Sequence, residues 1–252
     1  MIYKDLGIMD YKSAWDYQEN LVQQNREIKT KLGEAISYEL LALSKDQLAT
    51  TDNPPPTTHN SLLATHNYLL FCEHPAVYTL GKSGSMKNVL LSEKEMEEKE
   101  IEFFKTNRGG DITFHGLQQV VGYPILDLEN FYTDIGRYLR DLEEVIIKTI
   151  AEYGLKGERS KGETGVWIEP GVIGRERKIC AMGIRCSRWI TMHGFALNVN
   201  TDLSYFENII PCGIQNKQVT SIEKELNQKV SLEEVKEKLK KNFSAIFNVK
   251  II

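Results

Sequence analysis

The chain has no long apolar segment. Its 252 residues include no run of about 18 apolar residues, the length that a membrane-spanning helix needs. The N-terminal stretch MIYKDLGIMDYKSAWDYQEN carries charges throughout and has no apolar core of a secretion signal. We therefore expect a cytoplasmic protein that does not bind membranes.

An excess of positive charge is also missing. Lysine and arginine number 31 against 35 aspartates and glutamates, so the net charge is −4 at pH 7. Because nucleic-acid-binding proteins usually present a basic surface, we expect no nucleic-acid partner. The local basic stretches 174–178 and 185–189 are ordinarily solvated faces, and the alternative is a surface that binds an acidic protein.

Cysteine is scarce. Four residues, Cys72, Cys180, Cys186 and Cys212, are scattered along the chain. In a reducing compartment they are expected to be free thiols. For each of them the ordinary interpretation is a small buried apolar residue, and the alternative is one reactive thiol.

Neither of the common nucleotide-binding loops is present. AVYTLGKS ends like a phosphate-binding loop, but that motif needs a glycine where this chain has Ala76. The residues between, 77–80, are typical of a strand. No GxGxxG precedes a helix, so a dinucleotide-binding fold has no support.

Periodic apolar positions predict the elements. Residues 12–32 and 134–153 repeat at helical spacing, and Ser231 with Glu234 forms a capping box that starts a last helix. A charged helix is expected at 92–100. Strands are expected at 68–74, 76–81, 101–106, 119–128, 165–169, 178–186 and 189–199.

The last three strands follow one another too closely for parallel crossovers, which favours antiparallel pairing. The sequence therefore predicts one α+β domain over residues 1–252, with a mixed, largely antiparallel sheet flanked by helices. Residues 44–61 include three consecutive prolines, which fit neither a helix nor a central strand, so a surface loop is expected there.

His115 and His193 are the histidines to weigh as metal ligands. Neither has a histidine, cysteine or carboxylate three or four residues away on a helix, and a catalytic zinc site needs about three converging ligands. A hydrogen-bonded residue in or near the core is the better interpretation of each, and we expect no metal.

Two short segments suggest a site. RGG at 108–110 is either a glycine turn or a loop whose backbone approaches a ligand closely. Cys212 lies between Pro211 and Gly213, in a stiff bend that presents a thiol. A nearby lysine raises the thiolate fraction of a cysteine at pH 7, and Lys178 is a candidate.

Several segments, in order over roughly residues 68–225, resemble the lipoyl(octanoyl) transferases, which move octanoyl from acyl carrier protein to lipoyl domains. EHPAVYTLGKSG at 73–84 and RGGDITFHG at 108–116 are similar to two motifs of that family. GVWI and then the stretch KICAMGIRCSRWITMHGFALNVNTDLSYFENIIPCGI, at 178–214, resemble the motifs that follow.

The resemblance implies the fold of biotin and lipoate protein ligases, which is related to class II synthetases, and a catalytic dyad of Cys212 and Lys178. It implies no cofactor, because the thioester substrate is already activated. It also implies an acyl pocket formed by Arg108, Gly109, Gly110, Asp111, Ile112, Thr113, Phe114, His115, Ala181, Met182, Gly183, Gly194, Phe195 and Ala196.

The expected partners are octanoyl-acyl carrier protein and the lipoyl domains of 2-oxoacid dehydrogenase complexes and of the glycine cleavage H protein, with the enzyme a monomer. Two alternatives stay open: an ATP-dependent lipoate-protein ligase and a non-catalytic binder of acyl carrier or lipoyl domains. Leu117-Gln118 replaces the proline and glycine usual in the family, so Leu117 is the residue that would narrow or re-angle the pocket wall.

Overall fold

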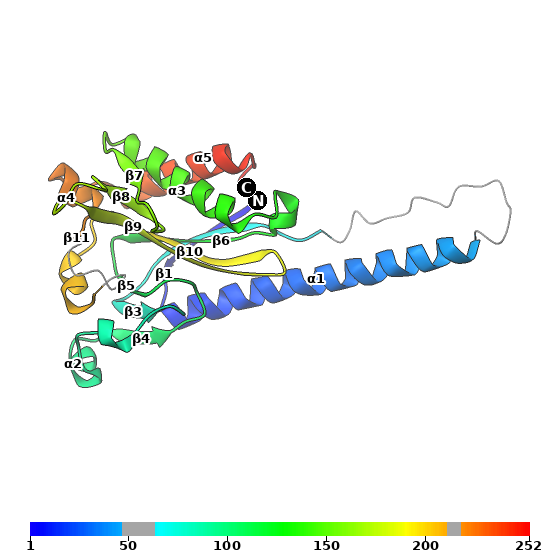
Figure 1. The fold of residues 1–252 in the computed structure, drawn as a ribbon, viewed down its shortest axis with the longest axis horizontal. Coiled ribbons are helices and arrows are strands. Elements are labelled where there is room, and N and C mark those ends of the chain that lie inside the picture. Colours follow the sequence, from blue (N-terminus) through cyan, green and yellow to red (C-terminus); the bar gives the residue numbers. More distant parts are fainter. Residues whose placement is uncertain (47–63, 211–217) are drawn as a thin grey trace.

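The computed structural model describes residues 1–46, 64–210 and 218–252. Two β-sheets and the helices packed on them form an α+β fold (Figure 1). The predicted fold class is confirmed.

Eight strands form the larger sheet, in the order β1-β2-β6-β10-β9-β8-β7, with β11 paired to β9. The β1–β2 and β9–β11 pairs are parallel and the other pairs are antiparallel, so the expected mixed, largely antiparallel sheet is confirmed. The strands are β1 (Ile2–Ile8), β2 (Tyr68–Glu73), β6 (Gln119–Ile125), β7 (Gly157–Arg159), β8 (Val166–Ile168), β9 (Arg177–Ser187), β10 (Ile190–Asn198) and β11 (Gln218–Val219).

The smaller sheet has β3 (Val77–Leu80) at its centre, parallel to β4 (Glu102–Lys105) and antiparallel to β5 (Ile112–His115). Strand β3 is the segment that resembled the end of a phosphate-binding loop, and its strand interpretation is confirmed. Strand β5 lies inside the glycine-rich RGGDITFHG segment and was not predicted, because four residues beside two glycines give no periodic signal.

Helices cover both faces of the larger sheet. Alternate residues of β2 point to opposite faces: Leu69 and Phe71 pack with α3 (Ile135–Ala151) and α5 (Leu232–Phe247), whereas Leu70 packs with α1 (Tyr11–Asp46). Short helices complete the fold, namely α2 (Glu93–Glu98), α4 (Ile222–Leu226) and the 3₁₀ turns η2 (Met86–Asn88), η3 (Leu128–Asn130) and η4 (Leu203–Asn208).

Helix α1 is longer than predicted. Its first half packs on the sheet, and its second half projects beyond the body of the protein (Figure 1). Periodicity fades where the helix leaves the sheet, since no apolar face is needed there. Residues 44–46, expected in a loop, are helical, and the three prolines lie outside the described residues. None of the described helices is long and apolar enough to cross a membrane.

Candidate active site

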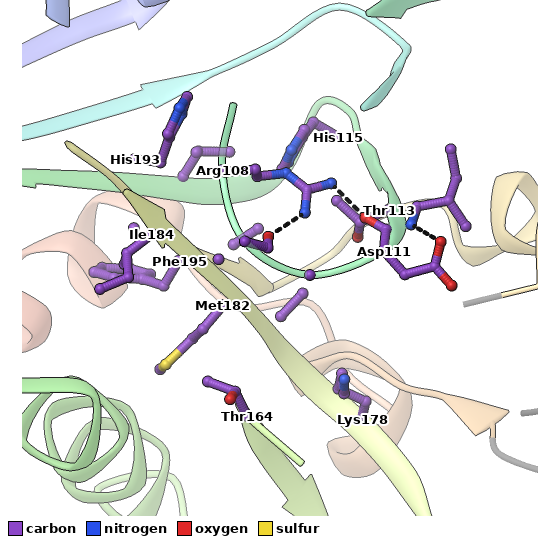
Figure 2. Close-up of a pocket in the computed structure, with 18 of the residues that line it drawn as sticks. Arg108, Asp111, Thr113, His115, Thr164, Lys178, Met182, Ile184, His193 and Phe195 are labelled. Carbon is purple, nitrogen blue, oxygen red and sulfur yellow. Dashed lines mark hydrogen bonds between the residues drawn. The ribbon is translucent and has the colours of Figure 1, made fainter. Parts of the chain in front are cut away.

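A cavity of about 490 Å³ is lined by residues from both sheets and from the loop before β5 (Figure 2). The three segments predicted to form an acyl pocket meet here, although they are far apart in the sequence. Except for Phe114, every residue predicted to contact the acyl chain lines the cavity. Lys178 lines it too.

Phe114 lies outside the cavity lining, which corrects its place in the predicted pocket. Side chains alternate along a strand, so in β5 Thr113 and His115 face the cavity and the ring between them faces away. The Phe114 ring stacks on Tyr205, with centroids 4.5 Å apart, in the apolar cluster of the smaller sheet. The missed strand is the physical reason for the difference.

Arg108 is buried and shapes the loop that carries it. Its Nη2 donates to the backbone carbonyl and to Oγ1 of Thr79, the latter at 2.9 Å, and to the carbonyl of Asp111 at 2.8 Å. A guanidinium offers its N–H donors in a fixed planar fork, which suits several convergent acceptors. Arg108 therefore ties the loop to β3.

Glycines let this loop approach β9 closely. Gly110 has φ of +87°, in the left-handed region that favours glycine. A Cβ on Gly183 would lie 2.6 Å from the carbonyl oxygen of Gly109, and the Gly109 amide donates to Ile184 at 2.8 Å. The RGG loop and β9 therefore form one continuous wall of the cavity.

His115 and His193 are buried and hydrogen-bonded, as expected. His115 Nδ1 lies 2.9 Å from Gln119 Oε1, and His193 Nε2 lies 2.7 Å from Asn107 Oδ1. Burial lowers the pKa of His115 well below its usual range and lowers the pKa of His193 to about 3. Both imidazoles are therefore neutral at pH 7. Within the described ranges, no three histidine, cysteine or carboxylate side chains are grouped so as to hold a metal ion.

Lys178 lies near the start of β9 and lines the cavity, and its Nζ is 4.5 Å from the centre of the Trp167 ring. The pairing of β8 with β9 steps from Val166–Cys180 to Trp167–Lys178, which leaves Ile179 as a β-bulge. Bulges bend a strand and redirect its side chains. The bulge therefore helps to set the direction of Lys178.

Cys212, the other member of the predicted dyad, lies outside the described residues, so its role stays a prediction from the sequence. Strand β11 follows it in the chain, pairs Val219 with Lys178, and lines the cavity. The other three cysteines are free thiols. Burial raises the pKa of Cys72 and Cys180 far above 9, as expected for small buried residues.

Several lining residues were not predicted. Tyr11 comes from the first turn of α1, Thr164 from the loop before β8, and Trp167 from β8. GVWI was recognised only as a segment of the family pattern. An aromatic residue inside a short family motif was the one available signal for Trp167.

Leu117 does not narrow the cavity. Its side chain is 50% exposed and is not part of the lining. The turn is held by Gln118, whose φ is +62°, whose amide donates to Glu73 at 2.7 Å, and whose carbonyl accepts from Asn200 at 3.1 Å. The departure from the family pattern therefore changes an outer turn and leaves the cavity wall intact.

Residues 45–244 match the family described as the lipoyl protein ligase A/B catalytic domain, and the chain belongs to this family. It is 55% identical to an octanoyltransferase of Christiangramia forsetii over 98% of this chain and 96% of that protein. It is 49% identical to an octanoyltransferase of Cytophaga hutchinsonii over 100% of this chain and 94% of that protein.

Solved structures of lipoate and biotin ligases share the fold. A bipartite lipoate protein ligase of Thermoplasma acidophilum aligns with a TM-score of 0.60 at 19% identity, over 74% of this chain and 73% of that one. A lipoate-protein ligase A bound with ATP aligns with a TM-score of 0.59 at 16% identity, over 74% and 76%. The biotin protein ligase of Aquifex aeolicus, at 12% identity and a TM-score of 0.50, covers 98% of this chain and 70% of its own.

Proposed function

We propose that the protein is an octanoyltransferase of protein lipoylation. It moves octanoyl from octanoyl-acyl carrier protein to a lysine of a lipoyl domain, through a thioester on Cys212. The observation that carries the proposal is the cavity beside Lys178, where the RGG loop, Ala181–Gly183 and Gly194–Ala196 meet. Full-length relatives that are octanoyltransferases support the same activity.

The cavity supplies the acyl-binding energy. Each methylene transferred from water to an apolar site is worth ~0.8 kcal/mol, so an eight-carbon chain gains about 5 kcal/mol. Met182, Ile184 and Phe195 provide apolar surface, and the close approach of the Gly109 and Gly183 backbones closes one side. Neutral His115 and His193 add no charge that would oppose an alkyl chain.

In the first step, the Cys212 thiolate attacks the carbonyl carbon of the octanoyl thioester. A carbon–sulfur bond forms to Cys212, the bond to the phosphopantetheine sulfur breaks, and the leaving carrier thiolate takes the proton of Lys178, which leaves this lysine neutral. Protonated Lys178 stabilises the negative charge on Cys212 before the attack.

In the second step, the ε-amine of the lipoyl-domain lysine attacks the octanoyl-cysteine. The amide bond forms, the bond to Cys212 breaks, and the amine loses one proton. Lys178, neutral at this stage, accepts that proton and is again the cation that faces a thiolate. The step needs no ATP, because the thioester already activates the acyl group.

The proposed protein partners are octanoyl-acyl carrier protein, the lipoyl domains of 2-oxoacid dehydrogenase complexes and the glycine cleavage H protein, and the enzyme acts as a cytoplasmic monomer. The bipartite lipoate protein ligase of Thermoplasma acidophilum, which has a similar fold, is described together with its E2 lipoyl domain, and this supports a lipoyl domain as acceptor. The sequence features that argue against nucleic acids and membranes agree with this choice.

Intact-mass spectrometry tests the acyl-enzyme. Mixing the protein with octanoyl-acyl carrier protein is expected to add one octanoyl group, and Cys212→Ala is expected to remove the adduct. Cys186→Ala is the matched control, because Cys186 is a partly buried free thiol on β9 and does not line the cavity. An adduct that persists in Cys212→Ala would exclude the proposed intermediate.

A further inference from the structure

Glu143 is a fully buried carboxylate on α3 that the proposed mechanism does not use. Its Oε2 pairs with Arg140 at 2.8 Å and with Arg159 at 3.1 Å. Burial raises its pKa even beside these two cations. A buried carboxylate is costly unless its partners are well placed, so the contacts of its second oxygen are informative.

The second oxygen holds the backbone of a loop. Glu143 Oε1 accepts a hydrogen bond of 3.0 Å from the buried amide of Gly165. Gly165 ends the loop between β7 and β8, and three residues of that loop, 162–164, line the cavity. Arg159 ends β7, so Glu143 contacts the chain on both sides of this loop.

Gly165 lies at the β-bulge that carries Lys178. It has φ of +114°, and a Cβ there would lie 2.5 Å from the Cys180 carbonyl oxygen and 3.7 Å from Cε of Lys178. Two residues further on, the Trp167 ring lies under the Lys178 ammonium. The hydrogen bond from the Gly165 amide to Glu143 therefore ties the start of β8 to α3, beside the part of β9 that directs this lysine.

We infer that Glu143 is a positioning residue for Lys178, acting through the Gly165 amide and the bulge between β8 and β9. The inference rests on the proposed function, in which Lys178 exchanges a proton and stabilises a thiolate. Displacing such a group by about 1 Å from its reactive geometry costs up to about 100-fold in rate. The acyl-binding residues Gly194–Ala196 lie on β10, which pairs with β6 and β9 and not with β8.

Two nearly isosteric variants separate the effect of the hydrogen bond to Gly165 from the effect of side-chain volume at position 143. Glu143→Gln keeps an oxygen that accepts from Gly165, and Arg140 and Arg159, with side chains 44% and 36% exposed, retain water as a partner. Glu143→Met fills the space but leaves the Gly165 amide without an acceptor. Glu144→Gln is the matched control, because Glu144 pairs with the same Arg159 and does not contact Gly165.

The measurement is octanoyl transfer to a lipoyl domain over a range of pH. Glu143→Met is expected to lower kcat by about 10- to 100-fold, to shift the pH dependence of kcat, and to change KM for the octanoyl donor less than about threefold. Glu143→Gln is expected to stay within about threefold of the parent kcat, and Glu144→Gln to match the parent in both readouts.

A parent-like kcat and pH profile in folded Glu143→Met would overturn the inference. If that variant does not fold, Glu143→Asp replaces it, because it keeps the charge for the arginines and withdraws the oxygen from Gly165; an unchanged kcat there has the same meaning. Lys178→Ala separates the two proposals. Full activity in Lys178→Ala contradicts the proposed function. If Lys178→Ala loses activity while Glu143→Met keeps the parent activity, only the inference is contradicted.

Discussion

Buried histidines around the cavity are held neutral by their surroundings. His74 lies 2.8 Å from the Tyr123 hydroxyl through Nε2 and 2.7 Å from the Met9 carbonyl oxygen through Nδ1. Its burial lowers its pKa to about 4. An unfolded chain has an ordinary histidine pKa near 6.5, so between pH 6.5 and 4 the unfolded state binds more protons at this position.

Acidification is therefore expected to destabilise the fold. As pH falls from 6.5 to 4.5, His74 removes about 2 kcal/mol from the free energy of unfolding, at about 1.4 kcal/mol per pKa unit. Urea titrations at both pH values measure the loss, which is expected to be smaller by about that amount in His74→Gln. Exposed His66→Gln is the control; an equal loss in both variants would contradict the account.

The chemical role of single residues was easier to predict than the direction in which their side chains point. Lys178 and the RGG loop were recognisable because their motifs are distinctive, and the structure brings them to one cavity. The orientation of the Phe114 side chain depends on the pairing of β5 with β3, which no local sequence pattern predicts. Glu143 was not predictable, because its partners lie on β7 and in the loop before β8, and only the fold brings them together.

Among the elements, β6 and β10 meet with unusually little space between them. Gly122 pairs with Phe195, and a Cβ at Gly122 would lie 2.2 Å from Cζ of that ring. The ring lines the cavity on one side and contacts the buried cluster around Phe71 on the other. Because a packed core yields little, a larger residue at position 122 moves the ring toward the cavity.

Gly122→Ala is accordingly expected to shorten the preferred acyl chain. KM for the octanoyl donor should rise about tenfold, which corresponds to about 1.4 kcal/mol of lost binding, while KM for a hexanoyl donor changes less. Steady-state transfer with both donors measures the ratio. Gly33→Ala serves as the control, because Gly33 lies on α1 with open space around it. An unchanged ratio would show that Phe195 does not limit chain length.

Long periodic elements were predictable, and so were the short elements β3, β4, β8 and α2, but some of the shortest strands were not. Helix α3 and the β9–β10 hairpin follow from regular apolar spacing and a close succession of strands, and the structure confirms them. Strands β7 and β11 have three and two residues, too few for a period of two to be visible. Their positions depend on tertiary pairing with β8 and β9.

At the scale of the whole molecule, the fold alone does not decide the reaction. A lipoate-protein ligase A that was solved with bound ATP shares this architecture at 16% identity. Strand β3 has the geometry of a sheet strand where a phosphate-binding loop was considered. The proposed function therefore depends on the cavity beside Lys178 and on an acyl donor that is already activated.

Transfer of octanoyl without ATP tests this central claim most directly. The purified protein is mixed with octanoyl-acyl carrier protein and a lipoyl domain in nucleotide-free buffer. The intact mass of the lipoyl domain is then measured by mass spectrometry. The account predicts one octanoyl amide per lipoyl domain, lost in Cys212→Ala and in Lys178→Ala. Modification that appears only with free octanoate and ATP would contradict it and identify a ligase.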